Sequence, residues 1–372
     1  MRVRTVVILL ILPRPNRILN ISMASLTQTA YFARRTINWA ILAVIAYILL
    51  RIFWSIFITV FLLIFPPKAL PPNHLFGKLP VLVFPLQATP SAKLTFQLQT
   101  IEGAVPKASA SATVYFMPKT APNLLGLNTA QDFAASLNFD PTPVQESKNI
   151  YRFNDAELSL RRLRYDIVSS NFILRYAFEQ DPSVFNQKNL PLPEAGKIEA
   201  INLLQSHNLY PDDLAGGTNE VSFLKLNETQ LVGTTSLSQA DAERIDFFQK
   251  PIGDTPMFTP YPDQAPVSII FSGSPDARKR IIQFAYTFWP IDYQTTATYG
   301  LKTSEQAWEE LQAGGGYIGR YPSTGNVAVV RNVYLAYYDS FDPQTYLQPI
   351  FVFDGDNGFR AYIPAVAPPW IQ

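Results

Sequence analysis

The sequence predicts an α+β fold, in which an N-terminal transmembrane helix precedes two modules that each combine helices with an antiparallel sheet. First, the run Ile37–Phe65 holds 29 residues with a single charge, Arg51. Second, the chain of 372 residues contains 18 Tyr, 26 Phe and 31 Pro, a composition that favours strands and Pro-broken loops over a helical bundle. Third, helical and strand-like patterns alternate twice after the apolar run.

The net charge of +1 conceals an uneven distribution. The first acidic residue is Glu102, and the 101 residues before it contain ten Lys and Arg. The remainder carries 20 basic and 29 acidic residues, which is a net charge of −9. Because phosphate backbones bind basic surfaces, we expect no nucleic-acid partner for this part of the chain.

The residue types needed for several chemistries are scarce. The chain has no cysteine, which excludes a disulfide framework, a thiolate metal site and a Cys nucleophile. Its two histidines, His74 and His207, stand 133 positions apart, whereas zinc sites built from histidine use two or three together. The sequence therefore predicts no metal and no cofactor.

The N-terminal segment before the apolar run, residues 1–36, is basic and is expected to be a cytoplasmic tail. Arg34 and Arg35 lie just before the span, and the positive-inside rule places them in the cytoplasm and the C-terminal part outside. Residues 1–22 are either part of this tail or an over-extended start, in which case translation begins at Met23. The predicted location is the cell membrane, with a single pass.

The predicted transmembrane helix, residues 37–65, has Arg51 at its centre. A helix of this length spans about 43 Å, enough for a hydrocarbon core of about 30 Å. An arginine at mid-membrane costs at least ~2.5 kcal/mol on insertion scales. Two interpretations stay open: Arg51 pairs with an acidic residue in a partner's helix, or it snorkels to the interface.

The segment after the helix, residues 66–91, contains seven prolines and is expected to be an extended, semi-rigid stalk. Residues 81–84 (VLVF) could dock as a short strand.

The first module is expected over residues 92–185. Residues 94–100 alternate apolar and polar side chains, which predicts a half-buried strand paired with 110–117. Thr129 and Asp132 resemble a capping box that opens a short helix. Three strands then form an antiparallel meander, at 149–153, 158–167 and 172–178.

The second module is expected over residues 186–372. Its predicted helices lie near 194–206, from Ser238 to Phe248, and after a capping box of Thr303 and Gln306 that ends at the glycines 314–316. The sequence DGDNG at 354–358 predicts a tight turn between two strands. The predicted strands are 221–226, 267–271, 281–289, 327–338, 347–353 and 359–363.

A helix followed by a meander, used twice behind one span, resembles the PepSY-like domains of YycH/YycI-type membrane proteins. The segments AWEELQAGGGYI (307–318), VYLAYYDS (333–340) and YLQPIFVFDGDNGFRAYIPAV (346–366) resemble the closing part of such a module. Residues 137–153 resemble a degenerate first copy, so the resemblance covers 129–366. It implies restraint of a membrane sensor kinase through membrane and extracellular contacts, and no catalytic residues. The chain also resembles uncharacterised single-pass proteins of reduced-genome bacteria.

Two motifs suggest a calcium site or a catalytic carboxylate pair, but their residues do not have the spacing that either site needs. An EF-hand loop beginning at Asp354 needs Gly at 359 and Glu at 365, where the chain has Phe359 and Ala365. Glu309 and Glu310 are adjacent on a helix, so their carboxylates do not face each other as a glycosidase pair would. The acidic run at 210–214 is interpreted as a solvated loop.

Aromatic residues of the last strands could line a peptide- or glycan-binding face, or belong to the core. With Arg51, the candidate partner-binding residues are Tyr334, Tyr338, Phe351 and Tyr362. The predicted function is that of a non-enzymatic, membrane-anchored, extracytoplasmic binding protein that contacts the lipid bilayer and a protein partner and regulates a membrane sensor or envelope complex. The alternatives are a cell-envelope enzyme that acts on wall polymer and an assembly or secretion subunit.

Overall fold

The structure is a computed structural model that describes residues 26–64, 70–87 and 94–372. The predicted tail up to residue 25, both alternative start residues and the ends of the predicted stalk lie outside these residues. The chain divides into two compact units, Met1–Lys68 and Ala69–Gln372, which are described separately. The mixed α and β composition confirms the predicted α+β class.

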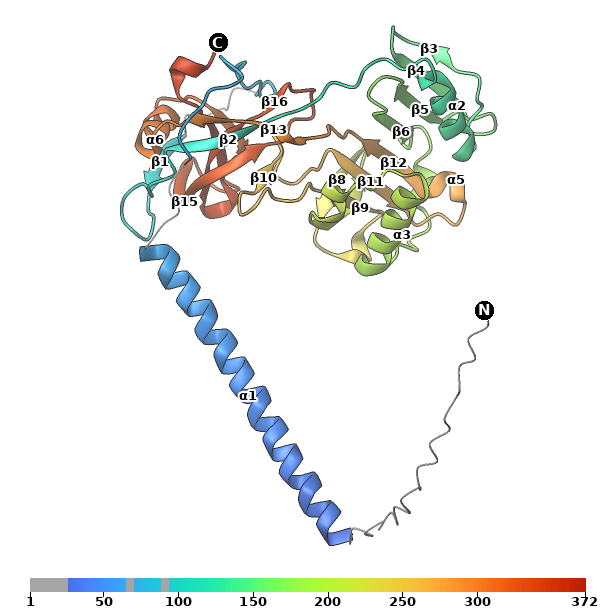
Figure 1. Cartoon of the computed structure of the whole chain (residues 1–372). Coiled ribbons are helices and arrows are strands. Elements are labelled where there is room, and N and C mark those ends of the chain that lie inside the picture. Colours follow the sequence, from blue (N-terminus) through green and yellow to red (C-terminus); the bar gives the residue numbers. More distant parts are fainter. Residues whose placement is uncertain (1–25, 65–69, 88–93) are drawn as a thin grey trace, which may run out of the picture. The chain divides into compact units, whose positions relative to one another are not determined.

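The first unit contains helix α1 (Leu26–Ile64), drawn in blue in Figure 1. Its stretch Arg34–Ile58 is 25 residues long and apolar enough to cross a membrane, and it is the one such helix in the described part of the chain. The helix is apolar all round rather than on one face, which is typical of a segment surrounded by lipid. The predicted apolar helix is therefore present.

The larger sheet of the second unit has nine strands, and each strand is antiparallel to the strands beside it. Helices α2 (Gly126–Ser136) and α3 (Pro193–Ser206) bury Ala130, Ala134, Ala200 and Leu204 against one face of it. The strands follow in the order β3 (Val144–Gln145), β4 (Ile150–Asn154), β5 (Arg161–Asp166), β6 (Phe172–Tyr176), β12 (Ile281–Tyr286), β11 (Val267–Ser272), β9 (Ala242–Phe247), β7 (Asn219–Asn227) and β8 (Gln230–Thr234).

Two further sheets contain the C-terminal strands. The six-stranded sheet joins β1 (Thr95–Leu98), β15 (Val327–Tyr338), β17 (Pro349–Gly355), β18 (Arg360–Pro364) and β14 (Tyr317–Arg320), and β10 (Met257–Phe258) pairs with β15. The three-stranded sheet joins β13 (Asp292–Gly300), β2 (Ser111–Phe116) and β16 (Tyr346–Leu347). Figure 1 shows these sheets in orange and red, with β1 and β2 in cyan. The short helices are η1 (Pro182–Phe185), α4 (Asp212–Ala215), η2 (Leu237–Gln239), α5 (Ala277–Arg280), η3 (Asp356–Gly358) and η4 (Pro368–Trp370).

Helix α6 (Ser304–Gln312) confirms the predicted capping box. The Thr303 hydroxyl accepts a hydrogen bond from the Gln306 backbone N–H at 3.2 Å, and the Thr303 N–H donates to the Gln306 side chain at 2.9 Å. Gly314 and Gly316 follow with φ of +87° and +76°, which end the helix. The helix buries Ala307 and Leu311 against the six-stranded sheet.

Helix α2 is also confirmed, but it begins before the predicted cap. Its first residue is Gly126, and the Thr129 hydroxyl lies inside the helix, where it donates to the Leu125 carbonyl at 3.1 Å. The Thr129 side chain, which was expected to cap the helix, instead donates to a backbone carbonyl one turn earlier, as Ser and Thr side chains do within helices.

The predicted helix from Ser238 to Phe248 is wrong. Strand β9 occupies 242–247, between β7 and β11, and Ala242, Ile245 and Phe247 have no exposed surface. Ala242, Ile245 and Phe248 recur at intervals of three and so imitate a helical spacing, although in a strand Ala242 and Ile245 lie on opposite faces.

The predicted pairing of 94–100 with 110–117 is also wrong. β1 pairs in parallel with β15, whereas β2 pairs with β13 and β16 in another sheet. Sheet pairing also crosses the expected boundary at 185/186, because β6 pairs with β12. The strands that flank the turn 354–358 do form the predicted hairpin, with Asn357 at φ +56°.

Residues 79–87 are named the strap here, because they run over the C-terminal sheets. Leu79 is fully buried. Its backbone N–H donates a hydrogen bond to the Trp370 carbonyl at 2.8 Å, and its carbonyl accepts one from the Gln372 N–H at 2.9 Å. The ring of Phe84 packs on Tyr317 and Tyr338 with centroids 5.1 and 4.7 Å apart. Residues 81–84 do dock, but without forming a strand.

Candidate functional site

The aromatic residues singled out in the sequence lie on two faces of the six-stranded sheet. Phe351 packs in the cluster that contacts α6, while Tyr338 and Tyr362 pack on the other face, under the strap. All three are fully buried. Tyr334 is half-buried and donates a hydrogen bond to Asp354 at 2.6 Å. The structure therefore gives these residues a packing role, and their binding role stays a prediction.

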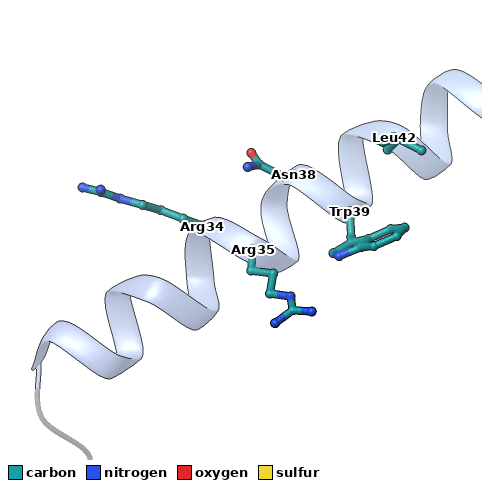
Figure 2. A pocket seen from close by; sticks show the side chains of 5 residues that line it. All are labelled: Arg34, Arg35, Asn38, Trp39 and Leu42. Atoms are coloured by element: carbon teal, nitrogen blue, oxygen red, sulfur yellow. The ribbon is translucent and has the colours of Figure 1, made fainter.

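Arg51 lies on the exposed surface of α1. The polar end of the same helix presents a shallow hollow lined by Arg34, Arg35, Asn38, Trp39 and Leu42. Figure 2 shows Arg34 extended to one side of the helix, with Arg35 and Trp39 together on another. Because one helix forms the whole hollow, it has no opposite wall to enclose a ligand.

The face of the nine-stranded sheet opposite α2 and α3 carries a groove of about 500 Å³, named the open-face groove here. Leu224, Leu231 and Ile270 contribute apolar side chains to it, and Arg175, Arg244 and Gln283 contribute polar ones. Its other lining residues are Phe178, Ser222, Gly233, Asp263, Gln264 and Ile282. The mixture of an apolar floor and a few polar groups is typical of binding sites.

Strand register explains why residues so distant in sequence meet there. Arg162 of β5 is opposite Arg175 of β6, which is opposite Gln283 of β12. Gln283 is opposite Ile270 of β11, and the row continues through Arg244 and Ser222, of β9 and β7. A second row on the same face runs from Arg152 through Arg164 to Ile173.

The arginines of this face are partly paired. Glu146 lies 2.7 Å from Arg164 and 3.7 Å from Arg152, and Glu179 pairs with Arg175. Arg162 forms no ion pair with any residue in the described ranges. Side chains of Arg164 and Arg175 are each 53% exposed, so a ligand can reach both.

The wall formed by Asp263 and Gln264 is fixed to the sheet. Asp246 accepts two hydrogen bonds at 2.7 Å from Arg244 and one at 2.8 Å from the Ala265 N–H. Asp263 also pairs with Arg320 of β14. The groove is therefore bounded by residues that are held by charge-assisted hydrogen bonds rather than by a free loop.

Gly233 keeps the groove open at the edge strand. It is opposite Leu224 in the register of β8 and β7, and a Cβ atom added there would meet no atom within 4 Å. Its φ is not in the left-handed region, so the backbone does not demand glycine.

Two buried carboxyl groups lie outside the groove. Burial, and secondarily the charge of Glu199, raises the pKa of Glu243 to about 7. Glu243 has no exposed surface, and neither of its oxygens has a hydrogen-bond partner in the described residues. Burial also raises the pKa of Asp339 to about 7. The hydrogen bonds at 3.3 Å that its two oxygens accept from Gln249 act in the opposite direction and lower this pKa.

Sequence reasoning missed the groove. The segment RRLRY at 161–165 alternates buried Arg161, Leu163 and Tyr165 with exposed Arg162 and Arg164, and this alternation was a visible signal for two arginines on one sheet face. The residues that line the groove come from strands up to about 120 positions away from this segment and become its neighbours only through sheet register.

Comparisons with known proteins assign no family. No protein-family model matches the sequence, and no curated protein matches it. The crystal structure of an uncharacterized protein from Eubacterium rectale ATCC 33656 aligns with a TM-score of 0.36 and 13% identity, over 68% of this chain and 82% of that chain. A likeness this distant says nothing about the groove.

Proposed function

We propose that the chain is a membrane-anchored, extracytoplasmic binding protein that holds a segment of a partner polypeptide in the open-face groove. α1 is the anchor, with its N-terminus in the cytoplasm as the basic residues before the span favour. The binding is non-catalytic and regulates a membrane sensor or an envelope complex. The observation that carries the proposal is the groove itself, with its apolar floor, polar rim and anchored wall.

The order of the elements supports a regulatory role of the PepSY-like kind. α2 precedes the antiparallel strands β4, β5 and β6, and α6 precedes β14, β15, β17 and β18. In this proposal the chain contains two helix-plus-sheet modules, and the partner contacts the sheet face that the helices leave uncovered. Arg51 then pairs with an acidic residue in the same partner's membrane segment.

The geometry favours binding over the enzyme alternative. Glu243 and Asp339 have the raised pKa values expected of acid catalysts, yet they are 0% and 2% exposed and neither lines the groove. A wall-polymer enzyme would need such carboxyls at the surface of a cleft.

Site-specific photo-crosslinking in native membranes tests the proposal. A photoreactive residue replaces Gln264 on the groove wall in the full-length protein, and the control replaces Glu309, which is exposed on α6. We expect a discrete polypeptide adduct from position 264 and none from 309. Equal labelling of both positions, or no adduct at 264, would contradict the proposal.

A further inference from the structure

Four arginines occupy neighbouring register positions on the uncovered face of the nine-stranded sheet. Arg152 is opposite Arg164 on β4 and β5, and Arg162 is opposite Arg175 on β5 and β6. Residues two apart on a strand share a face, so Arg162 and Arg164 bring both pairs together. Like charges directly opposite one another destabilise a sheet.

The nearby acids do not neutralise this set. Two glutamates, Glu146 and Glu179, pair with three of the arginines, which leaves the group with a net charge of +2. Residues 102–372 have a net charge of −9, so this face opposes the charge of the part of the chain that carries it. An anionic partner would be attracted here and repelled from most of the remaining surface.

The arginines border apolar side chains as well as polar ones. Arg175 itself lines the groove, whose floor includes Ile270, Leu224 and Leu231. A phosphate polymer or a lipid headgroup would satisfy the arginines and leave the half-buried Leu224 and Leu231 in contact with water. A polypeptide segment that alternates carboxylates with apolar side chains would satisfy both.

We infer that the partner segment bound in the groove is an acidic, extended polypeptide with apolar residues between its carboxylates. This inference rests on the proposed function and adds the chemistry of the ligand. The carboxylates contact Arg162 and Arg175, and the apolar side chains enter the groove beside Gly233. Arg162 and Arg175 lie on neighbouring strands, which are about 4.8 Å apart. Because arginine side chains are long, both can reach carboxylates on the same side of an extended peptide.

Peptide binding to the full-length protein in a neutral detergent tests the inference. The probes are fluorescent twelve-residue peptides of alternating Glu and Leu, Lys and Leu, or Glu and Ser. Inorganic polyphosphate and phosphatidylglycerol incorporated into the detergent micelles are the competitors. Fluorescence anisotropy is recorded at several salt concentrations. The variants are the double substitution Arg162→Gln/Arg175→Gln and a control, Arg331→Gln, which removes an exposed arginine that pairs with Asp356 on the C-terminal sheet.

We expect the Glu–Leu peptide to bind at least tenfold more tightly than the other two. The double substitution should weaken it at least tenfold and flatten its salt dependence, while Arg331→Gln leaves both unchanged. Equal binding of the Lys–Leu peptide, unchanged affinity in the double variant, or preference for polyphosphate or phosphatidylglycerol would overturn the inference.

Failure of the proposed function gives a different result. Gly233→Phe places a bulky side chain on the groove side of β8 and leaves every arginine in the sequence. If Gly233→Phe abolishes peptide binding while the arginine substitutions do not, the groove binds polypeptides and only the acidic chemistry is wrong. If the peptide binds and Gly233→Phe has no effect, the groove is not the binding site.

Discussion

Arg162 of β5 and Arg175 of β6 are direct cross-strand neighbours on the uncovered sheet face. Arg175 has Glu179 as an ion-pair partner, whereas Arg162 pairs with no acid in the described ranges. Two guanidinium groups at one register position reduce the stability of the fold and gain from an added anion. In the proposed binding mode, this arginine pair therefore lowers the stability of the fold and raises the affinity for the partner.

Replacing Arg162 should expose this conflict. Arg162→Glu places a carboxylate opposite Arg175, so we expect the free energy of unfolding to rise by about 0.2–1 kcal/mol while peptide binding is lost. Arg162→Gln removes only the repulsion and should give a smaller gain. Urea denaturation of the three proteins measures the difference. A fall in stability for Arg162→Glu would show that the arginine pair is not repulsive in the folded protein.

Glu243 should make stability depend on pH. Its folded-state pKa of about 7 lies above the ordinary 4.5, because burial and Glu199 outweigh the opposing charge of Arg280. The folded protein therefore binds this proton more tightly than the unfolded chain does. The contribution of Glu243 to the free energy of unfolding is greatest below pH 4.5. It falls as pH rises to about 7, by up to about 3 kcal/mol.

Glu243→Gln should remove this contribution. We expect the variant to be more stable than the natural chain at pH 8 and nearly equal at pH 5, as measured by thermal melts across that range. Glu309→Gln, at an exposed position on α6, is the control and should leave the pH profile unchanged. An unaltered profile in Glu243→Gln would mean that the carboxyl does not titrate between these pH values.

The strap should contribute to the stability of the C-terminal sheets. Leu79 is fully buried among Val114, Tyr299 and Val366, so Leu79→Ala should cost about 2–5 kcal/mol. Val83 on the same strap is 72% exposed, and Val83→Ala should change the free energy of unfolding by less than about 0.5 kcal/mol. Equal urea midpoints for the two variants would show that the strap does not pack as described.

Local sequence signals predicted some elements well. The capping box at Thr303 and Gln306 predicted the start of α6, because the hydrogen bonds of a capping box join residues that are three positions apart. The turn at 354–358 was also predictable from five adjacent residues. Such features depend on neighbours in sequence and need no knowledge of the tertiary structure.

Features that depend on distant partners were missed. β9 was mistaken for a helix because Ala242 and Ile245 are three positions apart, although both lie in a strand between β7 and β11. β1 was assigned to β2, although its partner β15 lies more than 200 positions away. The groove was missed for the same reason, because Arg175, Gln283 and Ser222 share a face only through the register of strands that are not consecutive.

The central claim is that a partner polypeptide occupies the open-face groove. The most direct measurement is quantitative mass spectrometry of polypeptides recovered with full-length protein from native membranes, comparing Gly233→Phe with Val232→Phe. Both place a phenyl ring on edge strand β8, but position 232 faces away from the groove and is 40% exposed. We predict that one partner is lost with Gly233→Phe and kept with Val232→Phe. Equal recovery of every polypeptide with both variants would contradict the claim.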